Sequence, residues 1–380
     1  MGTLKQVEHN LDKSVATEWY NAIQPAYNEF GEPNYLDKQG NLVEGIFNGI
    51  ENDIYHDLDA YSSSMIKEFA KSTPAHVYRN YFSNESRKRT QAQRNTLDTG
   101  TYGHELILEP MGFYDRYFRV PLAIDYPDAL HTAADLQDAL SKLNEKVSGK
   151  KSELIERLLK ADPNAVIFDD ILSKAIINGA GITAYNEAVK MVSEKKCSSI
   201  LAAFNDGGLS HITHKTPIDG LVWDDAHRIQ KTFQSHPRAK RLINNGYAEL
   251  TMIARDPESG LMLKVKFDYI NKEAIASDVK TTRSANPNKF RMQCRDLRYD
   301  VQASFYKYVA NLCGVPVKLF AFIGVEFMEA DICEVFELKR SRQAIADVDM
   351  KKAISTLKEC LDSENWFGYT RNDEVVVIDW

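Results

Sequence analysis

The chain has 380 residues, more than one small domain needs, and this length suits an α/β core with an insertion or an appendage. Its 43% hydrophobic and 27% charged residues are ordinary for a globular protein, and its net charge of −7 argues against indiscriminate wrapping of nucleic acid. The five cysteines show no metal-ligand spacing, and no apolar run approaches the roughly 20 residues of a membrane span. We therefore expect a soluble cytoplasmic protein without a membrane partner.

The first 125 residues fall into two parts with different patterns. Residues 1–60 are polar, rich in aromatic side chains and full of turn signals, and they predict a loosely structured leader. From residue 61 onward, a run of serines predicts a helix that begins near Ser63 or Ser64. His104 then follows two close glycines and enters a segment of buried character. A lone histidine in such a segment is more often structural than catalytic, so the residue alone leaves its role open.

Residues 126–222 predict a helical insertion, and the hairpin at 127–163 is its most distinctive part. Apolar residues at helical spacing mark two short amphipathic helices on either side of a Ser-Gly turn. Lysines at this turn coincide with a helix N-terminus, a combination that can hold a phosphate. The hairpin resembles a SAP motif, a small DNA-binding helix–turn–helix module, and the resemblance implies DNA contacts by Lys150, Lys151 and Arg157. The alternative is a packing hairpin with solvated lysines.

The stretch 261–282 carries the clearest chemical signal. Apolar and charged residues alternate on either side of a turn, which predicts two β-strands joined as a hairpin. Because side chains on a strand alternate between faces, Asp278 and Lys280 project on one side, and a paired strand can bring Asp268 beside them. Two carboxylates and a lysine at a strand end favour a divalent metal with a cation available for water or phosphate. The alternative is a surface hairpin with ordinary salt bridges, since D-x-K is a common tripeptide.

The segments around this hairpin complete the expected fold. Residues 248–254 predict a strand adjacent to Asp268 that carries Glu249. Residues 287–314 predict a helix on which Gln302 and Tyr306 share a face, although an exposed amide and a core tyrosine would explain the pair equally well. Two more strands and a long closing helix follow. Strands separated by helices in this order predict an α/β fold with a central mixed sheet flanked by helices.

Several segments, taken in order, resemble the RecE (exonuclease VIII) type of phage and prophage nuclease in the PD-(D/E)xK superfamily. They are SSSMIKEFAKSTPAHVYRN, LDTGTYGHELILEP, KVKFDYI, ASDVKTT and RYDVQASFYKYV. The resemblance covers roughly residues 55–125 and 220–370 and implies a nuclease core formed by 61–125 and 223–380. The 126–222 insertion is larger than a RecE core needs, which leaves its role open.

The resemblance also implies an active site. The residues that match the family's catalytic positions, with the Q-x-x-x-Y pair of RecB-type nucleases at the end, are His104, Asp268, Asp278, Lys280, Gln302 and Tyr306. Glu249 stands where the family often carries another acid. One departure is Phe267, which precedes Asp268 where the family pattern has proline.

The implied cofactor is Mg²⁺, with Mn²⁺ as a substitute. Its implied ligands are His104, Asp268, Asp278, the backbone carbonyl of Val279 and, as a further acid, Glu249. In this arrangement Lys280 would orient or deprotonate the attacking water, or neutralise charge on the phosphate. Oxygen ligands suit Mg²⁺ better than thiolates do, which agrees with the dispersed cysteines.

The activity that the resemblance implies is 5′→3′ digestion of linear double-stranded DNA, which exposes single strands for recombination by annealing. The implied partners are duplex DNA ends, a single-strand annealing protein of the RecT type, and further copies of the chain in a homo-oligomer such as a tetramer. The implied setting is the cytoplasm of a bacterial host, with a phage or prophage gene. Two alternatives remain: another PD-(D/E)xK DNA nuclease, RecB-like or endonucleolytic, and a non-catalytic SAP-type DNA-binding protein.

Overall fold

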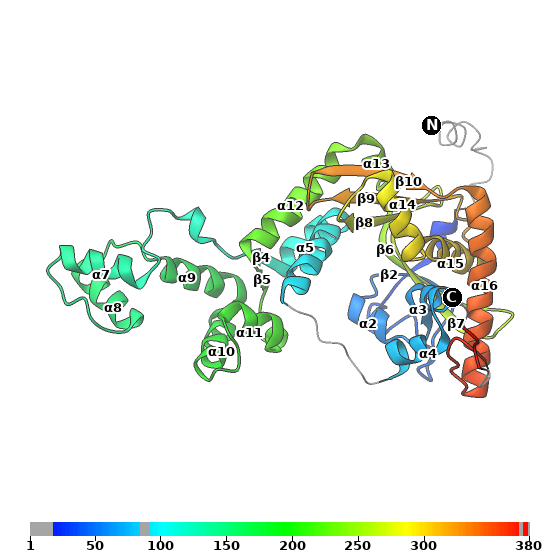
Figure 1. Cartoon of the computed structure of the whole chain (residues 1–380), viewed down its shortest axis with the longest axis horizontal. Coiled ribbons are helices and arrows are strands. Elements are labelled where there is room, and N and C mark those ends of the chain that lie inside the picture. The colour runs from blue at the N-terminus through cyan, green and yellow to red at the C-terminus, as the bar shows by residue number, and fades with distance from the viewer. Residues whose placement is uncertain (1–17, 84–90, 372–374, 379–380) are drawn as a thin grey trace. The chain divides into compact units, whose positions relative to one another are not determined.

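The computed structural model describes residues 18–83, 91–371 and 375–378, with only the backbone described for 91–98. The chain divides into two compact units (Figure 1). Unit 1 combines the chain up to Gln93 with the chain from Ile229 onward, and unit 2 consists of Arg94–Arg228. Each unit has hydrophobic clusters of its own. Among the described residues, no helix combines the length and apolarity that crossing a bilayer requires.

Unit 1 is built on one mixed sheet with the order β1-β2-β6-β7-β8-β9-β10, to which β3 adds by pairing with β7. The strands are β1 (Ile23–Pro25), β2 (Gly45–Asn48), β3 (Tyr61–Ser62), β6 (Gly246–Arg255), β7 (Met262–Asn271), β8 (Ile275–Thr282), β9 (Leu319–Glu326) and β10 (Ile332–Glu337). The β6–β7 and β7–β8 pairs are antiparallel, whereas β8 and β9 are parallel. The two strands of the predicted 261–282 hairpin are therefore neighbours near the centre of the sheet.

Helices flank this sheet, and α15 packs directly on β6 and β7. The helices of unit 1 are α2 (Asn52–Asp57), α3 (Ser63–Lys71), α4 (Pro74–Val77), α13 (Pro237–Leu242), α14 (Pro287–Asp296), α15 (Tyr299–Leu312) and α16 (Arg340–Ser363), while α12 (Gly220–Ser235) spans the boundary between the units. In Figure 1, α3, α15 and α16 lie side by side, and they contact one another. Val301, Phe305 and Val309 of α15 are fully buried in the main hydrophobic cluster. The expected class, a mixed α/β fold with a central sheet between helices, is confirmed.

Residues 18–60 differ from the expected loose leader. Strand β1 pairs with β2, and β2 pairs with β6 through Ile46↔Met252 and its neighbours. Phe47 and Tyr55 are buried in a second cluster that also contains Ile253 of β6. Strands of three and four residues between turns are too short to show the alternation that reveals longer strands, so composition alone concealed them.

Unit 2 is mainly helical. It contains α5 (Gln91–Leu108, which begins in unit 1), α6 (Pro110–Arg116), α7 (Ala133–Lys142), α8 (Lys151–Ala161), α9 (Phe168–Ala180), α10 (Ile182–Ser193), α11 (Ile200–Asp206) and the parallel pair β4 (Tyr117–Arg119) and β5 (Thr216–Ile218). The unit begins at Arg94, whereas the sequence placed the insertion at 126–222. His104 consequently belongs to unit 2. Leu136, Leu140, Leu154 and Leu158 pack together between α7 and α8, as the predicted hairpin requires.

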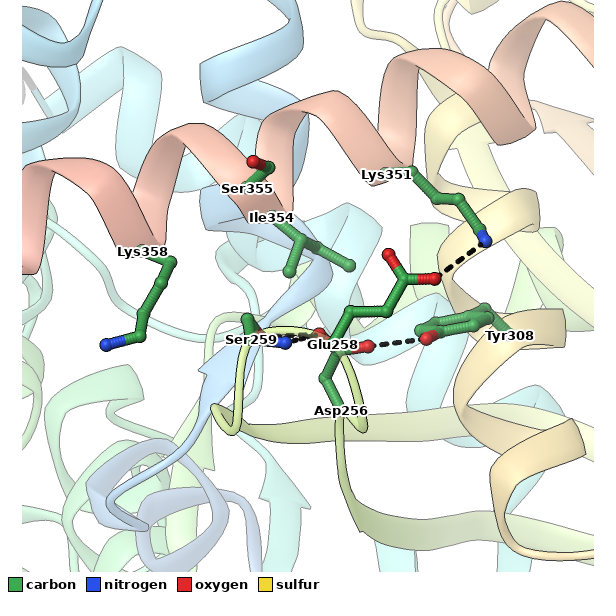
Figure 2. Close-up of a pocket in the computed structure, with 8 residues that line it drawn as sticks. All are labelled: Asp256, Glu258, Ser259, Tyr308, Lys351, Ile354, Ser355 and Lys358. Atoms are coloured by element: carbon green, nitrogen blue, oxygen red, sulfur yellow. Dashed lines mark hydrogen bonds and ion pairs between the residues drawn. The ribbon is translucent and has the colours of Figure 1, made fainter.

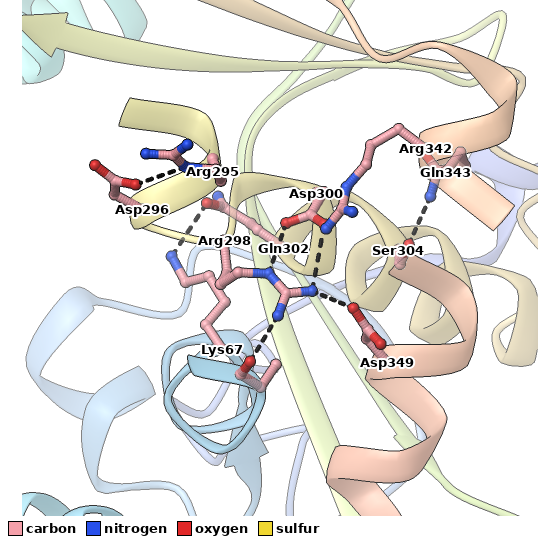
Figure 3. Close-up of polar contacts among 11 residues, drawn as sticks. Lys67, Arg295, Asp296, Arg298, Asp300, Gln302, Ser304, Arg342, Gln343 and Asp349 are labelled. Atoms are coloured by element: carbon pink, nitrogen blue, oxygen red, sulfur yellow. Dashed lines mark hydrogen bonds and ion pairs between the residues drawn. The ribbon is translucent and has the colours of Figure 1, made fainter. Parts of the chain in front are cut away.

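The predicted helix at 287–314 is broken at Arg298, whose φ is +52°. Arg298 stands at the N-cap of α15, and its guanidinium connects three helices (Figure 3). It donates a hydrogen bond to the carbonyl of Ala70 near the end of α3 at 2.6 Å, and it pairs with Asp300 of α15 and Asp349 of α16. Arg342 of α16 also pairs with Asp300.

The turn between β6 and β7 is fastened to α15 by Asp256 (Figure 2). The buried carboxylate accepts hydrogen bonds from the Tyr308 hydroxyl and from both the hydroxyl and the backbone N–H of Ser259. Burial acts to raise the pKa of Asp256, but these hydrogen bonds outweigh it and hold the pKa below its ordinary value. A cavity of about 120 Å³ adjoins the turn, and Lys351 lies 3.3 Å from Glu258 at its rim. The turn between β6 and β7 is thus fixed to α15, the helix that carries Gln302 and Tyr306.

Replacing Asp256 with asparagine should lower the free energy of unfolding by about 1–3 kcal/mol at pH 7, because the three donors lose their charged acceptor. A lowered folded-state pKa contributes stability above the unfolded value of about 3.9, and this contribution is lost as the pH falls through the folded value. The deficit of the variant should therefore shrink towards pH 3. Urea unfolding at both pH values measures it, with the exposed Asp128→Asn as control. Equal stability of Asp256→Asn and wild type at pH 7 would contradict the assignment.

Candidate active site

The site lies where β7 changes its pairing partner. One edge of β7 is paired with β6, so both β3 and β8 must use the other edge. There β7 pairs with β3 at Leu263 and Lys264, and with β8 at Tyr269 and Ile270. We call the stretch between these pairings, residues 265–268, the β7 gap. Helix α3 begins at Ser63, directly after β3, and therefore starts beside the β7 gap.

Asp268 stands at the end of the β7 gap and bridges to β8. The pairing of Tyr269 with Ser277 places Asp268 opposite Asp278 in the continued register. The Asp268 carboxylate accepts a hydrogen bond from the backbone N–H of Val279, with 2.7 Å between nitrogen and Oδ2. Because the N–H and C=O of one residue in an extended strand point to the same side, the carbonyl of Val279 also faces β7. Two carboxylates and one carbonyl thus border the gap.

Asp278 is buried, with 2% of its surface exposed, and both of its oxygens have polar neighbours. Oδ1 accepts a hydrogen bond of 2.5 Å from the side-chain amide of Gln302, and Oδ2 lies 2.7 Å from Lys280 Nζ. Burial raises the pKa of Asp278; the charge of Lys280 opposes this shift, and that of Asp268 adds to it. A buried carboxylate beside a second carboxylate favours a further cation at this position.

Lys280 lies between Asp278 and the ring of Tyr299. Its Nζ is 4.9 Å from the ring centroid, within the range of a cation–π contact. Burial acts to lower the pKa of Lys280, but the charges of Asp278 and Asp268 outweigh it and raise the pKa above its ordinary value. In this state the side chain is an ammonium. The structure therefore brings Asp268, Asp278 and Lys280 together, as the strand alternation predicted, while their roles stay predictions.

Lys67 is a neighbour of the site that the sequence analysis did not single out. Its Nζ donates a hydrogen bond of 3.2 Å to the carbonyl oxygen of the Gln302 side chain (Figure 3). It also lies 5.6 Å from the Tyr299 ring centroid, on the ring that Lys280 contacts. Tyr299 precedes Gln302 by three positions on α15, so helical spacing could have shown that they share a face. Nothing local could have revealed Lys67, which is 235 residues from Gln302 in the sequence.

Tyr306 lies one turn beyond Gln302 on α15 and points into the β7 gap. Its hydroxyl donates a hydrogen bond of 3.0 Å to the backbone carbonyl of Lys266, and its ring packs edge-on against Phe267. Burial raises the pKa of the phenol well above its ordinary value. In the structure Tyr306 thus serves as a partner for the backbone of β7. Its expected contact with water, metal or nucleotide stays a prediction.

Glu249 lies on β6, next to β7, as expected. Leu250↔Phe267 and Ala248↔Tyr269 flank it, so the register places it opposite Asp268. Its φ is +52°, a left-handed conformation that costs roughly 1 kcal/mol or more for a non-glycine residue. Its carboxylate lies 3.4 Å from Lys266 Nζ. The structure therefore gives Glu249 a cationic neighbour, and its part in a metal site stays a prediction.

The other predicted residues belong to unit 2. His104 is half-buried on α5, and its role as a metal ligand stays a prediction. Lys151 pairs with Asp169 and donates to the carbonyl of His131, while Arg157 donates to the carbonyls of residues 146 and 148. The contacts of Arg157 lie within the α7–α8 hairpin, and the ion pair of Lys151 joins α8 to α9. Lys150, at the N-cap of α8, is exposed, and it is the predicted DNA contact with the most accessible side chain.

The residues present fit a hydrated hard cation. No group of three or more His, Cys, Asp and Glu side chains in the described part of the chain is arranged to hold a metal. The donors at the β7 gap are instead the carboxylates of Asp268 and Asp278 and the carbonyl of Val279. Oδ2 of Asp278 is buried and, among the described residues, accepts no well-aligned hydrogen bond in addition to its ion pair. Mg²⁺ and Mn²⁺ prefer oxygen ligands, and Mg²⁺ usually retains several waters.

Comparisons with known proteins identify a family for the chain and two solved structures that are similar to it. The family model described as "PDDEXK-like domain of unknown function (DUF3799)" matches residues 62–375, a range that includes every residue of the site. Among solved structures, a candidate exonuclease from Eubacterium rectale shares 10% identity at a TM-score of 0.44, with 82% of this chain and 87% of that chain covered. A structure titled SSO0001 shares 13% identity at a TM-score of 0.23, with 45% and 71% covered. No curated protein sequence matches the chain.

Mg²⁺ or Mn²⁺ should raise the melting temperature of the protein, because a ligand that binds only the folded state stabilises it by about 2.7 kcal/mol at a hundred times its Kd. Asp278→Asn should lose most of this increment, since a neutral amide is a poor ligand for a hard cation. Thermal unfolding with and without metal measures it. Glu258→Gln, an exposed acid of the same unit, should keep the wild-type increment. An equal increment in Asp278→Asn would remove the metal site from the β7 gap.

Proposed function

The chain belongs to the PDDEXK-like family DUF3799, and from this premise we propose that it is a divalent-metal-dependent nuclease acting on DNA. The convergence of Asp268, Asp278 and Lys280 at the β7 gap is the observation that most supports the proposal. Hydrolysis of a phosphodiester needs charge stabilisation and a positioned water rather than a protein nucleophile. Two carboxylates beside an ammonium, at a break in a sheet, suit that chemistry.

In the proposed enzyme, Asp268, Asp278 and the Val279 carbonyl would hold the metal, and the resemblance to RecE-type nucleases adds His104 and Glu249 as further candidate ligands. Bound Mg²⁺ supplies Lewis-acid activation of water and charge stabilisation at the phosphate. Hydrogen bonds to the chain orient both carboxylates beforehand: the Val279 N–H fixes Asp268, and the Gln302 amide fixes Asp278. Groups held in advance need little rearrangement during the reaction.

Lys280 acts on the substrate side of this arrangement. Its ammonium would orient the attacking water and neutralise negative charge on the phosphate. The ion pair with Asp278 and the contact with the Tyr299 ring restrict the mobile side chain to the site. Gln302 and Tyr306 stabilise the structure around the site. Gln302 donates a hydrogen bond to Asp278, and Tyr306 donates one to the backbone of β7.

The finer features of the proposal rest on the resemblance to the RecE type of nuclease. They are exonucleolytic digestion of linear duplex DNA from 5′ to 3′, with Mg²⁺ as the metal in the cell. They also include exposure of a single strand for a RecT-type annealing protein, and assembly into a homo-oligomer such as a tetramer.

With Mg²⁺, the purified protein should release nucleotides from linear duplex DNA and leave covalently closed circles intact. Duplexes labelled at the 5′ or the 3′ end give the polarity, and loss of the 5′ label first is expected. Asp278→Ala should abolish cleavage, and Lys280→Ala should slow it by about 10²–10³-fold, because preorganised charge at the phosphate is lost.

The exposed variant Lys351→Ala serves as the control and should cleave at the wild-type rate. Wild-type activity in Asp278→Ala would show that the site is misassigned. Cleavage of closed circles as fast as linear duplexes would identify an endonuclease.

The α7–α8 hairpin generates a separate prediction. If Lys150 contacts a DNA phosphate, Lys150→Ala should weaken binding of all duplexes about equally and lower the salt dependence by about one phosphate contact. Fluorescence anisotropy over a salt series, in EDTA, measures both quantities. Lys160→Ala, an exposed lysine at the other end of α8, is the matched control. Unchanged affinity in Lys150→Ala would favour a hairpin whose role is packing alone.

A further inference from the structure

We propose that Lys67 and Lys280, on the shared ring of Tyr299, form a phosphate-binding site in which Lys67 contacts a non-bridging oxygen of the phosphodiester being cleaved. The inference rests on the proposed function and adds a substrate-binding residue to which the sequence analysis gave no role.

The backbone of Lys67 is held firmly at the site. Lys67 lies in the middle of α3, which starts from β3 at the border of the β7 gap. The other end of α3 is anchored by Arg298, whose guanidinium donates to the Ala70 carbonyl at 2.6 Å (Figure 3). Arg298 is itself held by Asp300 and Asp349. The position of Lys67 is therefore set by α15 and α16 and not by a surface loop.

The ammonium of Lys67 has no counter-ion within the described residues. Its hydrogen-bond acceptor is the neutral carbonyl oxygen of Gln302, and no described carboxylate lies within ion-pair distance. Burial lowers the pKa of Lys67 to about 8; the charge of Lys280 adds to the lowering, and the charge of Asp278, which lies beyond ion-pair distance, opposes it. Partly buried lysines are usually paired with an acid. A lysine held inside a site without one has the charge to receive an external anion.

Two cations next to one ring define where that anion would lie. Lys67 and Lys280 approach the Tyr299 ring to 5.6 and 4.9 Å from its centroid, and their charges repel each other. An anion between them replaces this repulsion with two attractions. Asp278 is the ion-pair partner of Lys280, so an anion held by both lysines would lie near a metal-binding carboxylate. A phosphate group has the charge and the several acceptor oxygens for this position.

The side-chain amide of Gln302 has one favourable orientation between its two charged neighbours. Its amide nitrogen donates to Asp278 and its carbonyl oxygen accepts from Lys67. Turning the amide over would set an oxygen against a carboxylate and an NH₂ group against an ammonium, so a single orientation satisfies both neighbours. Lys67 is thereby directed towards the same space as the carboxylates.

The chemistry needs no further reactant. Water oxygen forms a bond to phosphorus while the bond from phosphorus to the leaving oxygen breaks, and the leaving oxygen gains a proton as the water loses one. Negative charge on the non-bridging oxygens is stabilised by a positive group placed beside them beforehand. Lys67 would provide that charge on the side away from Lys280.

The test separates phosphate binding from cleavage. Without divalent metal, millimolar inorganic phosphate should raise the melting temperature of the wild type, and Lys67→Met should lose this shift. With Mg²⁺, single-turnover cleavage of linear duplex should fall by about 10–10³-fold in Lys67→Met, while Lys67→Arg, which keeps the charge, recovers a measurable part. Lys71→Met, on the same helix but exposed, should match the wild type in both measurements.

The Mg²⁺-induced thermal shift shows whether each variant keeps its metal site and its fold, and Lys67→Gln replaces Lys67→Met if the latter does not fold. Wild-type phosphate binding in a folded Lys67 variant overturns the proposal, even if cleavage slows, because Lys67 would then act only through Gln302. If Asp278→Ala still cleaves, the proposed catalytic site fails, yet the phosphate measurement still decides the role of Lys67.

Discussion

The carboxylate of Asp268 replaces a backbone acceptor for the N–H of Val279, and the rest of the site depends on this exchange. A backbone group that leaves a sheet ladder needs another partner, because burying it unpaired costs about 1–3 kcal/mol. Two side chains provide partners along the β7 gap: Asp268 for Val279, and Tyr306 for the carbonyl of Lys266. The strands can therefore stay apart in the middle of a sheet, where continuous pairing would leave no room for ions or water.

The charges gathered at this break contribute little to folding, since removing charges from water costs about as much as pairing them returns. Asp278 is nearly inaccessible, and its partners Lys280 and Gln302 come from its own strand and from α15. The strained backbone of Glu249, directly across from Asp268, likewise does not favour folding. Costs of this kind concentrate at functional sites. They suit the proposed site, whose charges metal and substrate would neutralise.

The sequence could predict what depends on local spacing. Two residues apart on a strand, Asp278 and Lys280 had to share a face, and four residues apart on a helix, Gln302 and Tyr306 had to be neighbours. The hydrogen bond from Tyr306 to the backbone of β7 could not be predicted. It depends on where the pairing partner of β7 changes from β3 to β8. Lys67 was out of reach because it joins the site only through packing of α3 on α15. The resemblance to RecE-type nucleases named His104, a choice that spacing alone would not have made.

The two-sided amide of Gln302 has a thermodynamic consequence. Because one rigid group touches Asp278 with its nitrogen and Lys67 with its oxygen, a cation drawn to the first residue and an anion drawn to the second are linked. Linkage is reciprocal: whatever factor the cation adds to the affinity for the anion, the anion returns to the affinity for the cation. A coupling of 1–3 kcal/mol, the usual range, corresponds to about 5–150-fold. Such a site would bind either ion alone weakly and both together tightly. The metal would then be retained more strongly when DNA is bound.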